Sequence, residues 1–217
     1  MSISIILPSF NEPRAIETLR ICKKLFPDSQ VICSTDKAGR GKGWAIKKGV
    51  LATCHDIIVF LDADMDIHPR MIKRLLPFLE DFDIVVGCKP IGPLPLSRKL
   101  ITLASRIYIK LLFWLDVDTQ SGIKAMHKRA ILSWATDGFA FDMEFLAKAK
   151  KRGLKLMQVD IIATQSKKKG IKVLWDTLKD SLKIWYRLSC RSEDQRTFRR
   201  SWNAFGGKLT MRLKSWL

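Results

Sequence analysis

Short apolar runs alternate with helix-like segments over the first 65 residues. The runs at 3–7 and 31–34, and the fully apolar run at 57–61, predict buried β-strands. Between them, apolar positions at helical spacing over 16–26 predict an amphipathic helix, and the glycine-rich turn 39–43 opens a second helix. This order predicts an α/β fold with a doubly wound sheet, whose ligands bind at the carboxyl ends of the strands.

Two aspartates, Asp62 and Asp64, directly follow the 57–61 strand. Carboxylates two residues apart at the tip of a core strand are suited to hold Mg²⁺ or Mn²⁺ against a diphosphate. An isolated Asp-x-Asp is more often a polar turn at a strand end. In this chain Pro8 and Asp36 end the two preceding strands, so we expect these residues to face one crevice.

The glycine-rich turn lacks the features of two common phosphate-binding loops. Trp44 follows Gly43 where a Walker loop needs Lys and then Ser or Thr. The dinucleotide fingerprint also fails, because Trp44 or Ile46 takes the place of its third glycine. A simple contact between Lys42 and a nucleotide phosphate stays open.

Five short motifs follow one another along most of the chain. They are Pro8-Ser9-Phe10-Asn11-Glu12, Gly41-Lys42-Gly43 with Ala45 and Gly49, Asp62-Ala63-Asp64, Gln120-Ser121-Gly122 with Lys124, and Phe141-Asp142-Met143-Glu144. Together they resemble the motifs of family 2 glycosyltransferases, and they are most similar to those of the dolichol-phosphate mannose and glucose synthases. The resemblance spans about 3–173, and five motifs in order are far more specific than one.

The resemblance implies a GT-A fold and a complete set of ligands. The donor would be a nucleotide sugar, either GDP-mannose or a UDP-sugar such as UDP-glucose. The cofactor would be Mg²⁺ or Mn²⁺, and the acceptor a polyprenyl or dolichyl phosphate. The motif 141–144 looks slightly more like the glucose branch than the mannose branch.

The resemblance also implies a donor site, position by position. The residues that would hold the nucleoside are Pro8, Glu12 and Asp36. Asp62 and Asp64 would bind the metal and the diphosphate. Asp66 matches a position where the family often has a metal-binding Gln, so it would be a third ligand.

This chain departs from the family pattern in two places. Its second strand offers only Thr35-Asp36 in place of paired acids followed by Gly and Ser, which leaves the choice between GDP and UDP open. Gly87-Cys88-Lys89 stands where the synthases often have Gly-Ser-Arg, and lysine is a less bidentate phosphate ligand than arginine.

Basic residues are expected to position the acceptor phosphate. Arg98 and Lys89 have this role by family position, and Lys167, Lys168 and Lys169 by their location between the sheet and an amphipathic helix. A run of lysines is also commonly a solvated loop.

The sugar side of the expected site comes from the last two motifs. Gln120 and Ser121 would line the sugar and the acceptor, while Asp142 and Glu144 open a helix and could bind hydroxyls of the donor sugar. If the acceptor were a hydroxyl, Asp142 would instead be its general base. The candidates for direct catalytic roles are Asp62, Asp64, Asp142 and Arg98.

The length of 217 residues predicts one α/β domain at 1–170, which includes an interfacial helix at 97–115. Basic amphipathic helices would follow at 171–217. The five cysteines show no Cys-x-x-Cys pair and no metal-site spacing, so we expect reduced thiols in the cytosol. The chain begins with a strand, and we expect neither a signal peptide nor a transmembrane helix.

A net charge of +18 predicts an acidic partner. Residues 165–217 hold fourteen Lys or Arg and four Asp or Glu, without any recognised nucleic-acid motif. Apolar faces beside basic residues recur at 97–115, 171–188 and 202–216, which favours an anionic membrane surface over nucleic acid. Each face could equally pack on the domain.

These patterns lead to one hypothesis and two alternatives. We expect a peripheral enzyme at the cytosolic membrane face that transfers mannose or glucose from a nucleotide to a polyprenyl phosphate, with a metal ion and with inversion. The first alternative is transfer to a hydroxyl of a lipid or glycan. The second is a non-catalytic basic module that binds nucleotides or RNA.

Overall fold

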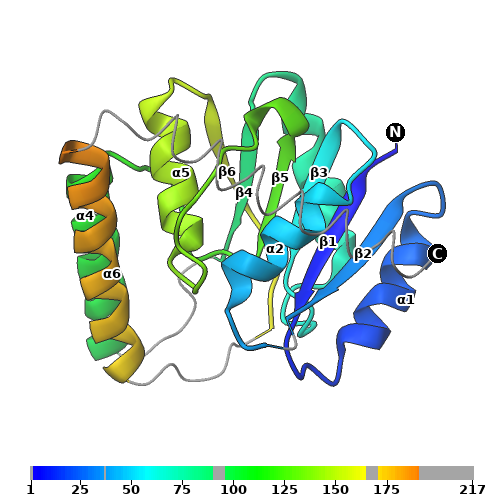
Figure 1. The fold of residues 1–217 in the computed structure, drawn as a ribbon, viewed down its shortest axis with the longest axis horizontal. Helices are drawn as coiled ribbons and strands as arrows, with labels where there is room; N and C mark the ends of the chain where they lie inside the picture. Colours follow the sequence, from blue (N-terminus) through cyan, green and yellow to red (C-terminus); the bar gives the residue numbers. More distant parts are fainter. Residues whose placement is uncertain (1, 37, 90–95, 165–170, 191–217) are drawn as a thin grey trace.

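The computed structural model describes residues 2–36, 38–89, 96–164 and 171–190 (Figure 1). Its strands are β1 (Ser4–Ser9), β2 (Gln30–Thr35), β3 (Ile57–Leu61), β4 (Ile84–Cys88), β5 (Ile123–His127) and β6 (Leu156–Asp160). Its α-helices are α1 (Ala15–Leu25), α2 (Lys42–Leu51), α3 (Ile72–Leu75), α4 (Leu96–Phe113), α5 (Phe141–Lys151) and α6 (Ile171–Cys190). Short 3₁₀ turns cover Pro69–Met71, Leu76–Glu80 and Lys128–Ala130.

The strands form one six-stranded sheet in the order β2-β1-β3-β5-β4-β6. Only β5 runs antiparallel to its neighbours, β3 and β4, and the other pairs are parallel. The five parallel strands therefore end at one edge, and β5 begins there. The prediction of a doubly wound, mostly parallel α/β sheet is confirmed.

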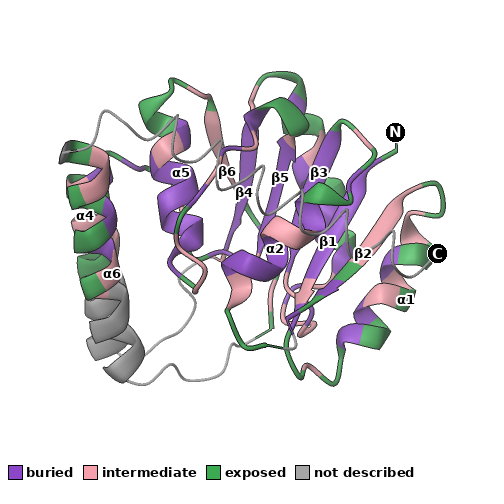
Figure 2. Cartoon of the chain, viewed as in Figure 1, coloured by how far each residue is buried: buried purple, intermediate pink, exposed green. Residues whose placement is uncertain are grey.

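The sheet separates two apolar cores. In β3, Ile58 and Phe60 face one core, and Val59 and its alternate neighbours face the other, as the period of a strand requires. Helices α2 and α5 cover the first face and α1 covers the second. Every residue of β3 and β4 is buried, which explains the unbroken apolar runs in the sequence (Figure 2).

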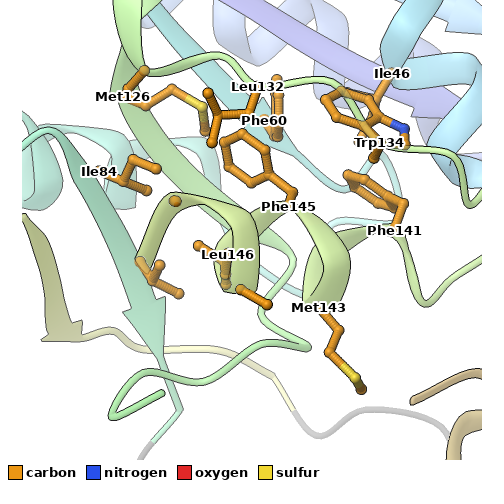
Figure 3. Packing of buried hydrophobic residues seen from close by; sticks show 14 of the residues in the cluster. Ile46, Phe60, Ile84, Met126, Leu132, Trp134, Phe141, Met143, Phe145 and Leu146 are labelled. Carbon is orange, nitrogen blue, oxygen red and sulfur yellow. The ribbon is translucent and has the colours of Figure 1, made fainter. Parts of the chain in front are cut away.

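Aromatic side chains fill the core between β3, α2 and α5. The Trp134 ring lies 5.4 Å from Phe141 and 5.8 Å from Phe145, and Phe145 lies 6.2 Å from Phe60 (Figure 3). Trp134 Nε1 also donates a hydrogen bond to Gly43 O at 3.2 Å. This packing fixes the start of α5 beside the start of α2, where the candidate site lies.

Helices α4 and α6 lie side by side next to α5 (Figure 1). Tyr108 Oη on α4 and Ser181 Oγ on α6 are 2.9 Å apart, and Ile184 of α6 is fully buried in the first core. The sequence pattern expected one apolar face along 171–188. The structure divides it, because Leu188 packs partly against the core while Trp185 points to solvent.

No helix among the described residues is long and apolar enough to span a bilayer. The expected amphipathic segment at 202–216, the lysine run at 167–169 and the side chain of Arg98 lie outside what the structure describes. The division of the chain at residue 170 stays a prediction.

The Asp83 carboxylate connects the start of β4 with the start of β6 through a hydrogen bond. Asp83 accepts a hydrogen bond from the Lys155 N–H at 3.0 Å and pairs with Arg129 at 3.2 Å. The Lys155 hydrogen bond, assisted by Arg129 against a smaller effect of burial, holds the pKa of Asp83 below its ordinary value.

Replacing this carboxylate should therefore have a pH-dependent cost. Asp83→Asn should lower the free energy of unfolding at pH 7 by about 1 kcal/mol, because it weakens a charge-assisted hydrogen bond and a partly exposed ion pair. Since the folded pKa is lowered, this stabilisation is present above the unfolded pKa of about 3.9 and is lost as the pH falls through the folded value. Urea unfolding between pH 7 and pH 3 should show the difference between the two chains shrinking on acidification. A difference that does not change with pH would contradict this account.

Candidate active site

The loops at the carboxyl edge of the sheet bring together most of the expected site. Residues 8–12 end β1 and follow it, Asp36 follows β2, 62–66 follow β3 and Lys89 follows β4. Residues 120–122 precede β5, which begins at the same edge because it is antiparallel. These expected site residues thus lie at the strand ends of one sheet, where ligands of such folds bind.

Asp62 is held against the loop that precedes β5. Its N–H donates to Gly122 O at 2.8 Å, and a Cβ on Gly122 would come within 2.5 Å of Asp62 Oδ2. The glycine of the Gln-Ser-Gly motif is therefore needed so that the carboxylate can lie here. On its other side, Asp62 Oδ1 is 2.7 Å from Lys42 Nζ.

Two lysines and two aspartates form a continuous chain of ion pairs across the site. Lys42 Nζ also lies 3.5 Å from Asp142 Oδ2, and Lys124 Nζ lies 2.6 Å from Asp142 Oδ1. Lys124 is 1% exposed and donates a further hydrogen bond to Ser121 O at 2.7 Å. Burial alone would lower the pKa of Lys42, but the charges of Asp62 and Asp142 outweigh it and raise that pKa.

Two glycines allow the start of α2, which carries Lys42, to approach the other residues of these ion pairs. A Cβ on Gly41, which has φ 123°, would lie 2.5 Å from Asp137 O. A Cβ on Gly43 would lie 2.6 Å from Thr136 O and 2.7 Å from the Cβ of Phe141. The Gly-Lys-Gly motif thus allows α2 to approach the 136–141 loop closely enough for Lys42 to reach Asp142.

Asp36 is buried beside this turn. Its Oδ2 accepts a hydrogen bond from the Gly41 N–H at 2.7 Å, and its Oδ1 lies 3.3 Å from Arg40 Nε. Burial by itself would raise the pKa of Asp36, but the Gly41 hydrogen bond and Arg40 hold it below its ordinary value. The Arg40 guanidinium also lies 3.2 Å from the centroid of the Trp44 ring. Sequence reasoning did not anticipate that Arg40 lies against this carboxylate.

Asp64 lies in a different electrostatic environment. None of the ion pairs between described residues involves it. Partial burial raises its pKa, and the negative charges of Asp62, Asp66 and Glu12 add to the increase against a hydrogen bond from the Asp66 N–H. A divalent cation would relieve this crowding of carboxylates, and oxygen ligands suit Mg²⁺ or Mn²⁺. The residues present therefore fit the implied metal.

A preassembled site with three carboxylates is not found. In the part of the chain that the structure describes, no three His, Cys, Asp or Glu side chains gather closely enough to hold a metal ion. Asp66 N–H donates to Asp64 Oδ1 at 3.1 Å, and Asp66 O accepts hydrogen bonds from Thr164. The role of Asp66 as a third metal ligand stays a prediction.

Glu144 makes several contacts within the protein, and its expected contact with the donor sugar stays a prediction. The buried carboxylate accepts hydrogen bonds from the N–H groups of Ala135 and Thr136 at 2.9 Å and from the Thr136 hydroxyl at 2.6 Å, and it pairs with Lys148 at 3.0 Å. Burial would raise its pKa, but Lys148 and these hydrogen bonds lower it overall. Glu144 fixes the loop that carries Asp137 toward α2.

The remaining predicted residues differ in their surroundings. Pro8 lies within β1 and pairs with Ser34 of β2 in the sheet register. Gln120 is exposed, whereas Ser121 is buried and its Oγ bonds to the backbone of Ile123. Lys89 is half-buried. Their contacts with donor or acceptor stay predictions.

The sequence placed Lys124 in the fourth motif but did not indicate its function. A hint of this function was present in the sequence, because Lys124 is the one charged residue in the otherwise apolar segment Ile123 to Met126. A lysine in such a strand is almost never fully buried unless it has an acidic partner. The sequence could not name that partner as Asp142, which lies on another element.

The comparisons agree with the expected family. Residues 16–104 match the family model described as glycosyl transferase family 2. An uncharacterized protein of Methanocaldococcus jannaschii is 26% identical over 194 residues, which covers 73% of this chain and 80% of that protein. The undecaprenyl-phosphate mannosyltransferase of Micrococcus luteus is 24% identical over 201 residues, with coverage of 74% and 83%.

Solved structures share the fold at lower identity. Glucosyl-3-phosphoglycerate synthase from Mycobacterium tuberculosis, in complex with Mn²⁺ and uridine-diphosphate-glucose, has a TM-score of 0.68 and 21% identity, and the match covers 85% of this chain and 78% of that one. Its complex with Mn²⁺, uridine-diphosphate and phosphoglyceric acid gives a TM-score of 0.69 and 19% identity, with coverage of 88% and 80%. The expectations of a GT-A fold and of similarity to family 2 glycosyltransferases are confirmed.

The close approach of Gly122 to Asp62 provides a test of the site. Gly122→Ala should displace the Asp62 carboxylate and weaken binding of a Mn²⁺–UDP or Mn²⁺–GDP complex about tenfold, because a charge-assisted contact is lost. Gly138→Ala is the matched control, since its added Cβ meets no atom within 4 Å. Calorimetric titration of both variants, with circular dichroism to confirm folding, would measure this. Equal affinities for the two variants would show that Asp62 does not bind this complex.

Proposed function

We propose that this chain, a glycosyltransferase with a family 2 domain of GT-A fold, moves a hexose from a nucleotide sugar to the phosphate of a polyprenyl lipid, with inversion at the sugar. The observation that carries the proposal is the chain of charges at the carboxyl edge of the sheet. Asp62 lies between Gly122 and Lys42, and two residues away Asp64 forms no ion pair with any described residue. Such a site is suited to a diphosphate that arrives with a divalent cation.

On the donor side, Asp62 and Asp64 would hold the metal, whose charge compensates the departing nucleoside diphosphate. Lys42, at the start of α2, would bind the same diphosphate from the opposite side. Pro8, Glu12 and Asp36 would contact the nucleoside. The donor is GDP-mannose or a UDP-sugar, and the UDP-glucose complex of the structural neighbour supports the second.

On the acceptor side, the surroundings of Asp142 favour a phosphate over a hydroxyl. A general base needs a free lone pair that can reach the proton it removes. Lys124, which is almost fully buried, lies 2.6 Å from one oxygen of Asp142 and holds that carboxylate toward β5. A phosphate monoester needs no such base, because its second pKa is about 6 and it is largely ionised at neutral pH.

The name of the Micrococcus luteus relative, an undecaprenyl-phosphate mannosyltransferase, supports a polyprenyl phosphate acceptor. Lys89 and Arg98, and Lys167 to Lys169, would supply the positive charge that positions the phosphate. Gln120 and Ser121 would lie toward the transferred sugar.

An exposed apolar face on α4 and α6 supports a location at a membrane surface. Its members are Leu103, Ile107, Leu111 and Trp114 near or on α4, and Leu182, Trp185 and Tyr186 on α6. Exposed lysines at 110, 179 and 183 accompany them. An apolar face with aromatic residues and a basic rim is typical of proteins that bind the interface of anionic bilayers. We propose that this face binds the cytosolic surface of the membrane that holds the lipid acceptor.

A donor and acceptor screen tests the proposed reaction. Purified protein with Mn²⁺ or Mg²⁺ should transfer sugar from one UDP- or GDP-sugar to a short polyprenyl phosphate, but not to the matching polyprenyl alcohol. Asp64→Asn should lower turnover by roughly 100-fold or more, because the metal loses a charged ligand. Full activity in EDTA would contradict the metal role. Transfer to the alcohol, or to a small hydroxyl acceptor such as phosphoglyceric acid, would favour the alternative with a hydroxyl acceptor.

Binding to vesicles tests the proposed membrane face. Leu111 and Trp114 are 74% and 78% exposed, so the double variant Leu111→Gln/Trp114→Gln should keep the fold and lose apolar insertion. Co-sedimentation with anionic liposomes should fall about tenfold, and the remaining binding should depend more steeply on salt. Ile16→Gln is the control, since Ile16 is 73% exposed on α1, on the other face of the sheet. Equal losses for both variants would contradict a specific membrane face.

A further inference from the structure

We infer that Lys42 is an exchangeable cation, which occupies Asp62 in the donor-free protein and leaves that carboxylate when the metal and nucleotide bind. This inference rests on the proposed function, because it takes Asp62 and Asp64 as the metal ligands. It goes beyond that function because it assigns two alternative ion-pair partners to Lys42. In the first state the lysine pairs with Asp62, and in the second it pairs with the diphosphate.

Lys42 blocks the carboxylate that the metal requires. Its Nζ lies 2.7 Å from Asp62 Oδ1, while Asp62 Oδ2 packs so closely on Gly122 that an added Cβ there would lie only 2.5 Å away. A metal ion bound to Oδ1 at about 2.1 Å would lie within a few ångströms of the ammonium group. Two cations this close repel each other, so the lysine must move before the metal can bind both Asp62 and Asp64.

Asp142, the other aspartate in this row of ion pairs, makes the movement of Lys42 possible. When Lys42 withdraws, Asp142 keeps its shorter ion pair with Lys124, at 2.6 Å, and loses only the contact at 3.5 Å. Lys124 is almost completely buried and also bonds to Ser121 O, so it is fixed in place. Asp142 is therefore never left as a buried charge without a partner, which would be strongly destabilising.

The bound diphosphate gives the displaced lysine a new partner. Lys42 is the first residue of α2, so its ammonium group starts beside the positive end of the helix dipole. An anion arriving at this helix end would meet both charges at once. The exchange predicts that the protein binds metal weakly alone and more tightly with nucleotide, because only the nucleotide attracts Lys42 away from Asp62.

A nearby ion pair gives a matched control. Lys47 lies on the same helix, is 13% exposed compared with 15% for Lys42, and pairs with Asp137 at 2.6 Å. Its partner belongs to the 136–138 loop and not to the metal ligands. A change from Lys to Met at either position removes one positive charge from a half-buried ion pair, but only the change at Lys42 would free Asp62.

Electron paramagnetic resonance of free Mn²⁺ measures the exchange without any turnover. The full-length wild type, Lys42→Met and Lys47→Met would be titrated with Mn²⁺, first alone and then with UDP or GDP. Without nucleotide, Lys42→Met should bind Mn²⁺ about tenfold more tightly than the wild type, since a competing cation is gone, and Lys47→Met should match the wild type. With nucleotide this advantage should disappear, because the variant lacks the lysine that binds the diphosphate.

The outcomes separate this inference from the proposed function. If the wild type binds Mn²⁺ with nucleotide but Lys42→Met gains less than about twofold without it, Lys42 is a fixed structural partner and the inference is wrong. If neither the wild type nor any variant binds Mn²⁺ under either condition, the proposed metal site is wrong, and so is the inference. Lys42→Gln, which keeps a hydrogen-bond donor without the charge, should give the same result as Lys42→Met if the latter folds poorly. Thermal melts with and without Mn²⁺ would confirm that each variant is folded.

Discussion

The buried ion pair between Lys124 and Asp142 is the interaction on which the candidate site depends. A fully buried ammonium group without a partner would be strongly destabilising, so the start of β5 and the start of α5 must meet. Their meeting places the second oxygen of Asp142 toward α2, where Lys42 extends the chain of charges to Asp62. These ion pairs thereby hold β5, α5 and α2 together at the edge of the sheet, beyond the apolar core.

The same chain of charges decides what chemistry the site supports. Asp142 lies between two ammonium groups in the donor-free protein, and its lasting ion pair with the buried Lys124 favours a role in organising the site over removing a proton. Asp64, in contrast, is surrounded by like charges and has no basic partner among the described residues. The balance is negative near the tip of β3 and positive near the start of α2. A diphosphate with its metal ion is complementary to both.

Outside the site, the two faces of the sheet differ in their covering. The face under α1 is closed by that helix and by the 3₁₀ turns around α3, whereas the opposite face continues through α5 to the paired helices α4 and α6. These two helices bury some residues against the domain and expose other apolar residues, including Trp185 of α6, and Trp114 directly after α4 is exposed as well. The exposed apolar residues and the net charge of +18 are the observations on which the proposed contact with an anionic bilayer rests.

The amino-acid sequence by itself determined the class of fold and indicated that the candidate site residues lie at the strand ends. The unbroken apolar run 57–61 required a strand buried on both faces, and the glycine-rich turn 39–43 marked the start of a second helix. The five motifs indicated the family through their resemblance to its motifs, and the structure places each of them at a strand or helix end. These features are local, so the order of residues along the chain is enough to recognise them.

Only the tertiary structure decided which charges meet. The sequence grouped Glu144 with Asp142, but positions two apart on a helix point in different directions, and the Glu144 carboxylate accepts hydrogen bonds from the 135–136 backbone. It also treated 171–188 as having one apolar face, although packing against α5 buries Ile184 and leaves Trp185 exposed. The pairing of Lys42 with Asp62 joins residues twenty positions apart, and that of Lys124 with Asp142 joins two different elements. Such contacts depend on how strands and helices are arranged in space, which local patterns of residues do not specify.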